Sequence, residues 1–211
     1  MKKEEKTRLT RERILAAGIL EFGSKSYDAA SINSICEAGQ ISKGLLYHNF
    51  KSKDDLYLHC VKHCYDQLIA AFKAQPFTIT SAEEGLQKVL LIRQNFFSEN
   101  PLYANIFFNA VLQPPRHLIP ELDRLHKDLD DYFSQCYLEV LDHLTLRDTV
   151  TKTVAMEYFT AVCEMFNGYF QNKARQDGDY RTLIQAHEGT LSTIFDVMLY
   201  GIAKKPPEPR S

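Results

Sequence analysis

Apolar residues recur every three or four positions along most of the chain, and no stretch competes with the alternation of a half-buried strand. Capping signals and prolines divide this pattern into long segments. They predict helices over about 53–74, 81–98, 101–114, 120–144, 150–176 and 180–203, separated by breaks at 76–80 and 177–179. The proline-rich end from residue 206 cannot continue a helix. The expected fold class is all-α.

Two shorter helices joined by a tight turn are predicted between residues 31 and 53. In the first, Ser31 is a suitable N-cap, and Ile32 and Ile35 form one buried edge. Residues 39–41 are too few for anything but a turn.

The second short helix has a small, polar and basic outer face. Ser42 can cap it, and Leu46 and Phe50, four residues apart, face inward. The outside is then left to Lys43, Gly44, Tyr47 and His48. A helix with a cation, a position without a side chain and two polar rings suits the DNA major groove.

These residues and their flanks resemble the TetR family of bacterial transcriptional regulators, over about the first third of the chain. Residues 13–17 (Arg-Ile-Leu-Ala-Ala) and 20–23 (Leu-Glu-Phe-Gly) are similar to the first helix of the family. Residues 46–50 (Leu-Tyr-His-Asn-Phe), followed by 52–56 (Ser-Lys-Asp-Asp-Leu), resemble its most specific signature.

The resemblance implies a three-helix, helix-turn-helix DNA-binding domain at residues 1–53. It implies a larger helical effector-binding and dimerisation domain at 54–203, and a flexible tail is expected at 204–211. It places Lys43, Gly44, Tyr47 and His48 in the groove and Ser31, Ser42 and Lys53 at phosphates.

Two positions depart from the family pattern. The turn carries Gly39-Gln40 where the family has Ala-Gly, and Ala30-Ser31 stands where the family favours Thr or Ser. If the turn requires positive φ at Gln40, its side chain costs up to roughly 1–2 kcal/mol.

The net charge of −2 hides an uneven distribution. Residues 1–53 contain ten Lys and Arg against six Asp and Glu, whereas the remainder contains fifteen against twenty-one. The positive charge therefore coincides with the proposed DNA-binding segment.

Composition and missing motifs exclude several other classes. No apolar run approaches the roughly 18 residues of a membrane-spanning helix, and the charged N-terminus leads into no apolar signal region. The five cysteines, an odd number without framework spacing, fit reduced thiols, so a cytoplasmic protein is expected. No catalytic or phosphate-binding motif occurs, and we expect neither an enzyme nor a cofactor.

The last two helices carry more apolar surface than one bundle should leave exposed. Ordinary core packing within the chain is one interpretation; the family resemblance favours a homodimer. The predicted interface residues are Val162, Phe166, Tyr169, Leu191, Ile194, Phe195 and Met198.

The region between the DNA-binding segment and these helices is rich in aromatic residues with interspersed polar groups. Such a pattern is typical both of a core and of a small-molecule pocket, and the resemblance favours a pocket for an unidentified effector. The candidate lining is Phe96, Tyr103, Phe107, Phe108, Asn109, Tyr132, Tyr137, Tyr158 and Phe166.

A histidine and cysteine cluster, His59, Cys60, His63 and Cys64, supports an alternative in which metal, thiol oxidation or a protein partner controls DNA binding. However, successive helical positions diverge by about 100°, so one helix cannot direct all four at one ion. Core packing of the cysteines is favoured, and no metal is expected.

The sequence therefore indicates a homodimeric transcriptional regulator, a repressor in the favoured interpretation. Double-stranded operator DNA and a small-molecule effector are its expected partners. A helical ligand-binding protein or enzyme whose N-terminal segment binds no DNA is the remaining alternative.

Overall fold

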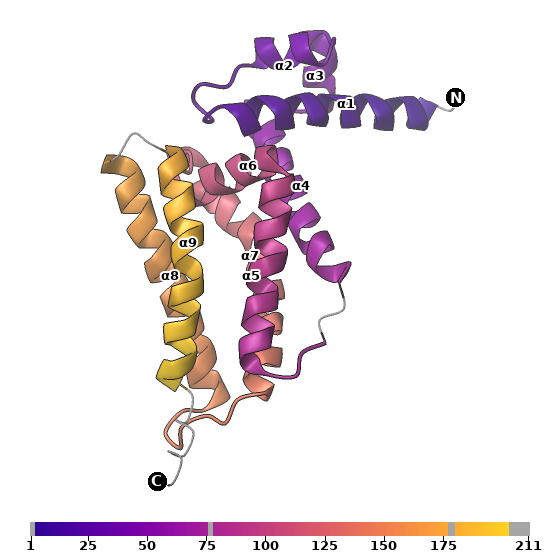
Figure 1. Cartoon of the computed structure of the whole chain (residues 1–211). Helices are drawn as coiled ribbons and strands as arrows, with labels where there is room; N and C mark the ends of the chain where they lie inside the picture. Colours follow the sequence, from indigo (N-terminus) through magenta and orange to yellow (C-terminus); the bar gives the residue numbers. More distant parts are fainter. Residues whose placement is uncertain (1–2, 76–77, 177–179, 203–211) are drawn as a thin grey trace, which may run out of the picture. The chain divides into compact units, whose positions relative to one another are not determined.

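The structure is a computed structural model that describes residues 3–75, 78–176 and 180–202 of the 211-residue chain. Within those ranges the chain forms α-helices and one short 3₁₀ turn, with no β-strand (Figure 1). The all-α prediction is confirmed. The predicted break at 177–179, residues 76–77 of the earlier break, and the tail from residue 204 lie outside the described residues.

The N-terminal elements are α1 (Lys3–Ser24), α2 (Ile32–Ala38), α3 (Lys43–Asn49) and α4 (Lys53–Lys73). The two short helices predicted around the turn are α2 and α3. We call α1, α2 and α3 together the reading head.

The later elements are α5 (Ala82–Glu99), α6 (Pro101–Leu112), η1 (Arg116–Leu118), α7 (Ile119–Asp142), α8 (Lys152–Gln176) and α9 (Tyr180–Ile202). The starts of α4 and α5 follow the local capping signals. The backbone N–H of Asp55 donates to Ser52 Oγ at 3.1 Å, and that of Glu84 donates to Ser81 Oγ at 3.2 Å. Caps read from the sequence therefore locate α4 and α5 closely.

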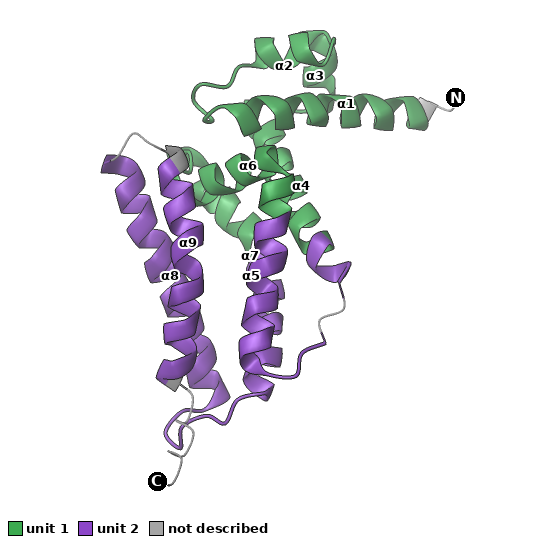
Figure 2. Cartoon of the chain, viewed as in Figure 1, with its two compact units in different colours: residues 1–70, 96–128 green, residues 71–95, 129–211 purple. Residues whose placement is uncertain are grey.

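The chain divides into two compact units (Figure 2). Unit 1 comprises residues 1–70 and 96–128, and unit 2 comprises residues 71–95 and 129–211. The divisions fall within α4, α5 and α7 rather than at loops. The boundary expected at residue 53 separates the DNA-binding domain from the effector-binding and dimerisation domain, and it stays a prediction.

In unit 1, α1 packs against α2 and also against α6. Each of the helices α1 to α4 contributes a completely buried side chain to the core of this region: Ile14, Ile35, Leu46 and Leu56. A Cβ at Gly23 would lie 2.8 Å from Leu102 Cβ, so only glycine allows this approach of α1 to α6.

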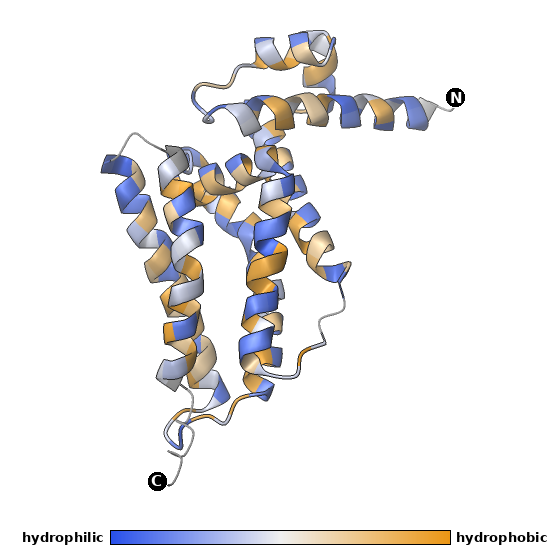
Figure 3. Cartoon of the chain, viewed as in Figure 1, coloured by the Kyte–Doolittle hydropathy of each residue, from blue (hydrophilic) through white to orange (hydrophobic). Residues whose placement is uncertain are grey.

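In unit 2, α8 packs against α9, and both helices interleave apolar with polar positions (Figure 3). A Cβ at Gly85 of α5 would lie 2.7 Å from Val140 of α7, and Tyr137 of α7 stacks on Phe159 of α8 at 4.1 Å. Among the described helices of the chain, none is long and apolar enough to cross a membrane.

Candidate nucleic-acid interface

Helix α3 presents the predicted outer face to solvent. Lys43, Gly44, Tyr47 and His48 are exposed, with half of the Tyr47 surface accessible, whereas Leu46 is completely buried. A Cβ at Gly44 would meet only Ser42 Oγ, at 4.0 Å, so the protein leaves open space there. The helix thus has a firm inner edge and an unobstructed outer face.

Both short helices are capped as the sequence predicts. Ser31 Oγ accepts from the Ser34 N–H at 3.0 Å, and Ser42 Oγ accepts from the Leu45 N–H at 3.1 Å. The predicted phosphate contacts Ser31 and Ser42 therefore serve the fold as N-caps. Their positions at helix N-termini are also favourable for an anion.

The turn between α2 and α3 has an uncommon backbone conformation. Gly39 ends α2 with φ −80°, and a Cβ there would lie 3.2 Å from Ala17 Cβ. Gln40 has φ 49°, in the left-handed region. Gln40 therefore has the positive φ whose cost was given above for this turn. The order Gly39-Gln40 places a side chain in a backbone conformation that glycine would adopt with less strain.

Lys53, at the first turn of α4, is held by a neighbouring aromatic ring. Its Nζ lies 4.3 Å from the centre of the Tyr27 ring. The Tyr27 hydroxyl donates to Asp54, which His117 of η1 also approaches, at 3.3 Å. The Tyr27 hydrogen bond and the contact with His117 hold the pKa of Asp54 below its ordinary value. Asp54 therefore stays ionised near neutral pH and fixes Tyr27 beneath Lys53.

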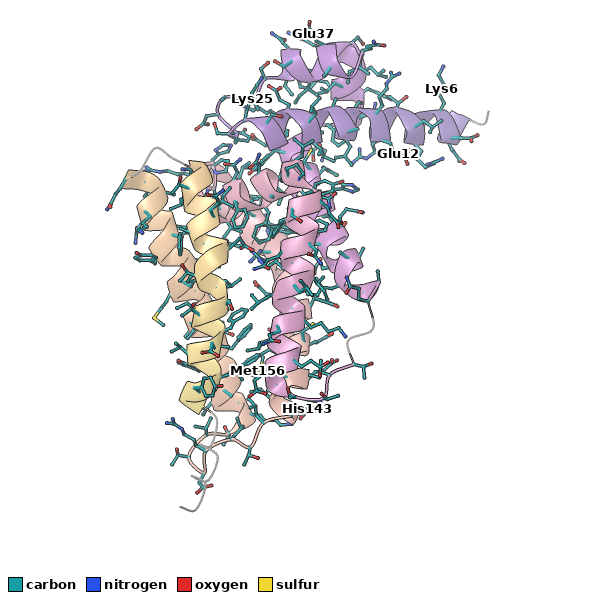
Figure 4. The ribbon with its side chains drawn as sticks, in the orientation of Figure 1. Lys6, Glu12, Lys25, Glu37, His143 and Met156 are labelled. Carbon is teal, nitrogen blue, oxygen red and sulfur yellow. The ribbon has the colours of Figure 1, made fainter. Side chains whose placement is uncertain are left out.

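Figure 4 shows Lys6 and Lys25 near the two ends of α1, and Glu37 on the side of α2 that faces away from α1. Lys25 forms an ion pair with Glu21 at 2.8 Å. Lys and Arg outnumber Asp and Glu over residues 1–53, the segment that contains α1, α2 and α3.

The four residues of the histidine and cysteine cluster have separate partners. Cys60 and Cys64 are fully buried, and burial raises the pKa of the Cys60 thiol. His59 contacts Arg11 of α1, and the ring of His63 lies edge-on to Tyr103. In the described part of the chain no three His, Cys, Asp or Glu side chains gather as metal ligands would. Control through this cluster is not favoured.

The predicted dimer residues divide into two groups. Phe166, Leu191, Phe195 and Met198 are buried within the single chain, whereas Tyr169 is exposed and Val162 and Ile194 are intermediate. The reason is that the two helices pack these four side chains into the core of unit 2. The exposed large apolar side chains of α8 and α9 are instead Val154, Tyr158, Met165, Tyr169, Val197 and Tyr200.

The predicted pocket residues fall into two sets. Phe96, Tyr103, Phe107, Phe108 and Asn109 belong to unit 1, where Phe107 and Phe108 are buried with ring centres 5.2 Å apart. The set in unit 2 is Tyr132, Tyr137, Tyr158 and Phe166. Of these, Tyr158 is exposed and Tyr137 is buried with a hydroxyl that has no hydrogen-bond partner.

Unit 2 contains a buried polar cluster that the sequence pattern did not predict. Arg93 of α5 binds the Glu188 carboxylate of α9 through Nε and Nη2 at 3.0–3.2 Å, and the His187 ring lies 3.1 Å from the same carboxylate. Burial alone would raise the pKa of Glu188, but the Arg93 charge and the hydrogen bonds outweigh it and lower the pKa to about 2. Burial lowers the pKa of His187. A sequence signal for this cluster is Arg93 itself, which directly follows the apolar run 89–92.

A short exposed helix, capped and set on a second helix by a tight turn, on a net-positive segment, defines a helix-turn-helix DNA-binding protein. Residues 14–60 match the family described as "Bacterial regulatory proteins, tetR family". Through this segment the chain is thus similar to the tetR family, and it is a DNA-binding transcriptional regulator.

Similar proteins extend the likeness beyond the reading head. The icaADBC biofilm operon negative regulator IcaR of Staphylococcus aureus is 23% identical over 164 residues, which cover 77% of this chain and 76% of IcaR. The regulator UidR of Escherichia coli is 25% identical over 126 residues, 60% of this chain and 63% of UidR.

Solved structures share the fold. FadR of Bacillus subtilis, solved in complex with stearoyl-CoA, superposes with a TM-score of 0.64 at 15% identity, covering 90% of this chain and 98% of FadR. A TetR-family regulator of Mesorhizobium loti gives a TM-score of 0.63 at 18% identity, covering 97% of this chain and all of that one.

Proposed function

We propose that the protein is a homodimeric repressor that binds operator DNA through α3 and is controlled by a small molecule bound in its helical body. The outer face of α3 carries the proposal: Lys43, Tyr47 and His48 are exposed together around the open position at Gly44. Lysine and the polar rings can reach base edges, and the missing side chain allows close approach. Ser31, Ser42 and Lys53 flank this face and hold it to the phosphates.

Repression is proposed from similarity to IcaR, which is described as a negative regulator. One short recognition helix reads only a few base pairs, so two copies are needed for a specific operator. We propose that the copies meet through the exposed apolar side chains of α8 and α9. Gly168 and Gly189 support this arrangement, because a Cβ at either would meet no atom within 4 Å and a partner helix can approach closely.

A small-molecule effector is supported by the complex of FadR with stearoyl-CoA, a protein of similar fold. In this chain, Tyr137 of α7 offers a buried hydroxyl without a partner, beside the ring of Phe159. A buried hydroxyl left without a hydrogen bond costs about 1–3 kcal/mol, which a polar group of a ligand would recover. We therefore propose Tyr137 as the first effector contact to test.

Selection from a random library of duplexes tests the proposed function without knowledge of the operator. The protein should enrich a two-fold symmetric sequence, and Tyr47→Ala should enrich a different sequence or none. Leu91→Ala, at an exposed position of α5, is the matched control and should enrich the parent sequence. Enrichment of no sequence by the parent protein would contradict DNA recognition.

A further inference from the structure

Arg11 of α1 joins three elements of unit 1 at the end of the recognition helix α3. Its Nη1 donates to the carbonyl oxygen of Asn49, the last residue of α3, at 2.7 Å. Its Nη2 lies 2.7 Å from Nε2 of His59 on α4. The guanidinium also lies over the Phe50 ring, 4.3 Å from its centre. One side chain therefore holds the C-terminal end of α3 against α1 and α4.

The geometry determines which form of His59 can make this contact. An arginine carries only N–H donors, so Nε2 of His59 must act as an acceptor. The other ring nitrogen, Nδ1, lies 2.7 Å from the Asp55 carbonyl oxygen, which only accepts, so Nδ1 carries the proton. Both hydrogen bonds exist together only for the neutral ring with its proton on Nδ1.

A second proton would break the contact with Arg11. Protonation of Nε2 places an N–H against the N–H of Arg11 and brings two positive charges together. The charged groups that face His59 are Arg11 from α1 and Asp55 from its own helix, with the Phe50 ring at its edge. Asp55 Oδ1 lies 3.3 Å from Nδ1 and favours the charged ring. In the charged ring, however, Nε2 carries a proton and can no longer accept a hydrogen bond from Arg11.

We propose that Arg11, oriented by a neutral His59, is a positioning residue for the recognition helix, and that protonation of His59 weakens operator binding. The proposal rests on the proposed DNA-binding function. It gives one histidine of the histidine and cysteine cluster a role without metal, in which the protonation state of His59 affects the position of α3. Cys60 and Cys64 take no part, because they are buried in the core.

Four variants separate this role from others. His59→Gln keeps an acceptor for Arg11 and a donor for Asp55 without a titrating ring, whereas His59→Phe keeps a ring beside Phe50 without the acceptor. Arg11→Gln removes the link to α3. Arg8→Gln is the charge control, because Arg8 lies one turn earlier on α1 and pairs with the exposed Glu12 (labelled in Figure 4).

Affinity for the duplex selected at pH 8 is measured by fluorescence anisotropy at pH 8 and pH 5.5. The parent and Arg8→Gln should both lose about tenfold in affinity at pH 5.5 relative to His59→Gln, which keeps the other ionisable groups of the parent. At pH 8, His59→Gln should bind like the parent, and His59→Phe and Arg11→Gln about tenfold more weakly. Arg11→Gln should keep the salt slope of the parent, because Arg11 acts through α3.

Three results would overturn the proposal. They are parent affinity in Arg11→Gln at pH 8, an unchanged acid loss in His59→Gln, and a salt slope in Arg11→Gln shallower by about one unit, which assigns Arg11 to a phosphate. Thermal melting of each variant separates lost folding from lost binding.

Hydrogen exchange without DNA keeps this inference separate from the proposed function. The Phe50 N–H, which donates to Leu46 O at 2.9 Å, reports the end of α3. Its protection factor should fall at pH 5.5 in the parent and stay constant in His59→Gln. If no duplex is selected but this difference appears, DNA recognition fails and the Arg11–His59 contact stands. Equal protection in the two proteins contradicts the inference itself.

Discussion

At the scale of single residues, Gln40 and Gly44 are opposite cases. Gln40 stands where the backbone conformation favours glycine, whereas Gly44 stands where packing within the protein does not require glycine. Gln40 adopts φ 49°, and a side chain in the left-handed region is strained. Gly44 lies in the first turn of α3, with open space where a Cβ would point. The residue at position 40 therefore affects the stability of the fold, and the residue at position 44 affects how closely a partner can approach α3.

Gln40→Gly should stabilise the protein by about 1 kcal/mol, because the turn would no longer hold a side chain at positive φ. Urea unfolding followed by circular dichroism measures the change. Gln40→Ala is the matched control and should give no gain, since alanine keeps the Cβ. A destabilised glycine variant would show that the Gln40 side chain makes a contact worth more than the strain.

Gly44→Ala should leave the fold intact, or stabilise it by up to about 1 kcal/mol through helix propensity. Operator affinity should nevertheless fall about tenfold or more, because the added methyl group occupies the space that the groove requires. The melting temperature and the dissociation constant are compared in the same preparation. Unchanged affinity would place Gly44 outside the DNA contact.

At the scale of elements, local signals in the sequence predicted most helix starts, and contacts distant in sequence escaped prediction. Ser31 and Ser42 act within three residues of themselves, so a short motif is enough to locate α2 and α3. Arg93 and Glu188 are 95 residues apart, and Arg11 and His59 are 48 apart, so no local pattern joins them. The periodicity of α8 and α9 could not separate their outward apolar side chains from buried ones such as Phe166 and Phe195, because both recur at helical spacing.

The Arg93–Glu188 pair ties α5 to α9 and should make stability depend on acid pH. The pKa of Glu188 is lowered from 4.5 to about 2 in the folded chain. A lowered folded pKa gives stability that is fully present above pH 4.5 and is lost as the pH falls toward about 2.

Glu188→Gln should therefore reduce the unfolding free energy at pH 6 by roughly 2–4 kcal/mol, because Arg93 stays buried without a counter-charge. The variant should lose less stability than the parent between pH 5 and pH 3. Glu83→Gln, at an exposed position of α5, is the control and should follow the parent. An equal acid response in Glu188→Gln and the parent would mean that the pair contributes no pH dependence.

At the scale of the whole molecule, the proposed function requires a second copy of the chain. The side chains that remain exposed on α8 and α9 differ from most of those predicted from the sequence, so they make the sharper test. Met165 has 66% of its surface exposed, which means that its replacement leaves the monomer core intact. Val197 and Tyr200 of α9 are each 60% exposed and offer the same advantage.

Met165→Asp should produce a folded monomer. A charge buried without a partner at the dimer interface costs about 3 kcal/mol or more, which raises the dissociation constant of the dimer about a hundredfold. Light scattering measures the mass in solution. Leu91→Asp, at a position 57% exposed on α5, is the matched control and should stay dimeric. A dimeric Met165→Asp variant would move the interface away from this part of α8.

Hydroxyl-radical footprinting of the parent protein on its selected duplex tests whether two copies of α3 read operator DNA. We expect two protected patches on one face of the duplex, related by a two-fold axis. Their centres should lie one helical turn apart, about 10 base pairs, or a whole multiple of it. A single protected patch, or protection that does not depend on the sequence, would contradict recognition by paired α3 helices.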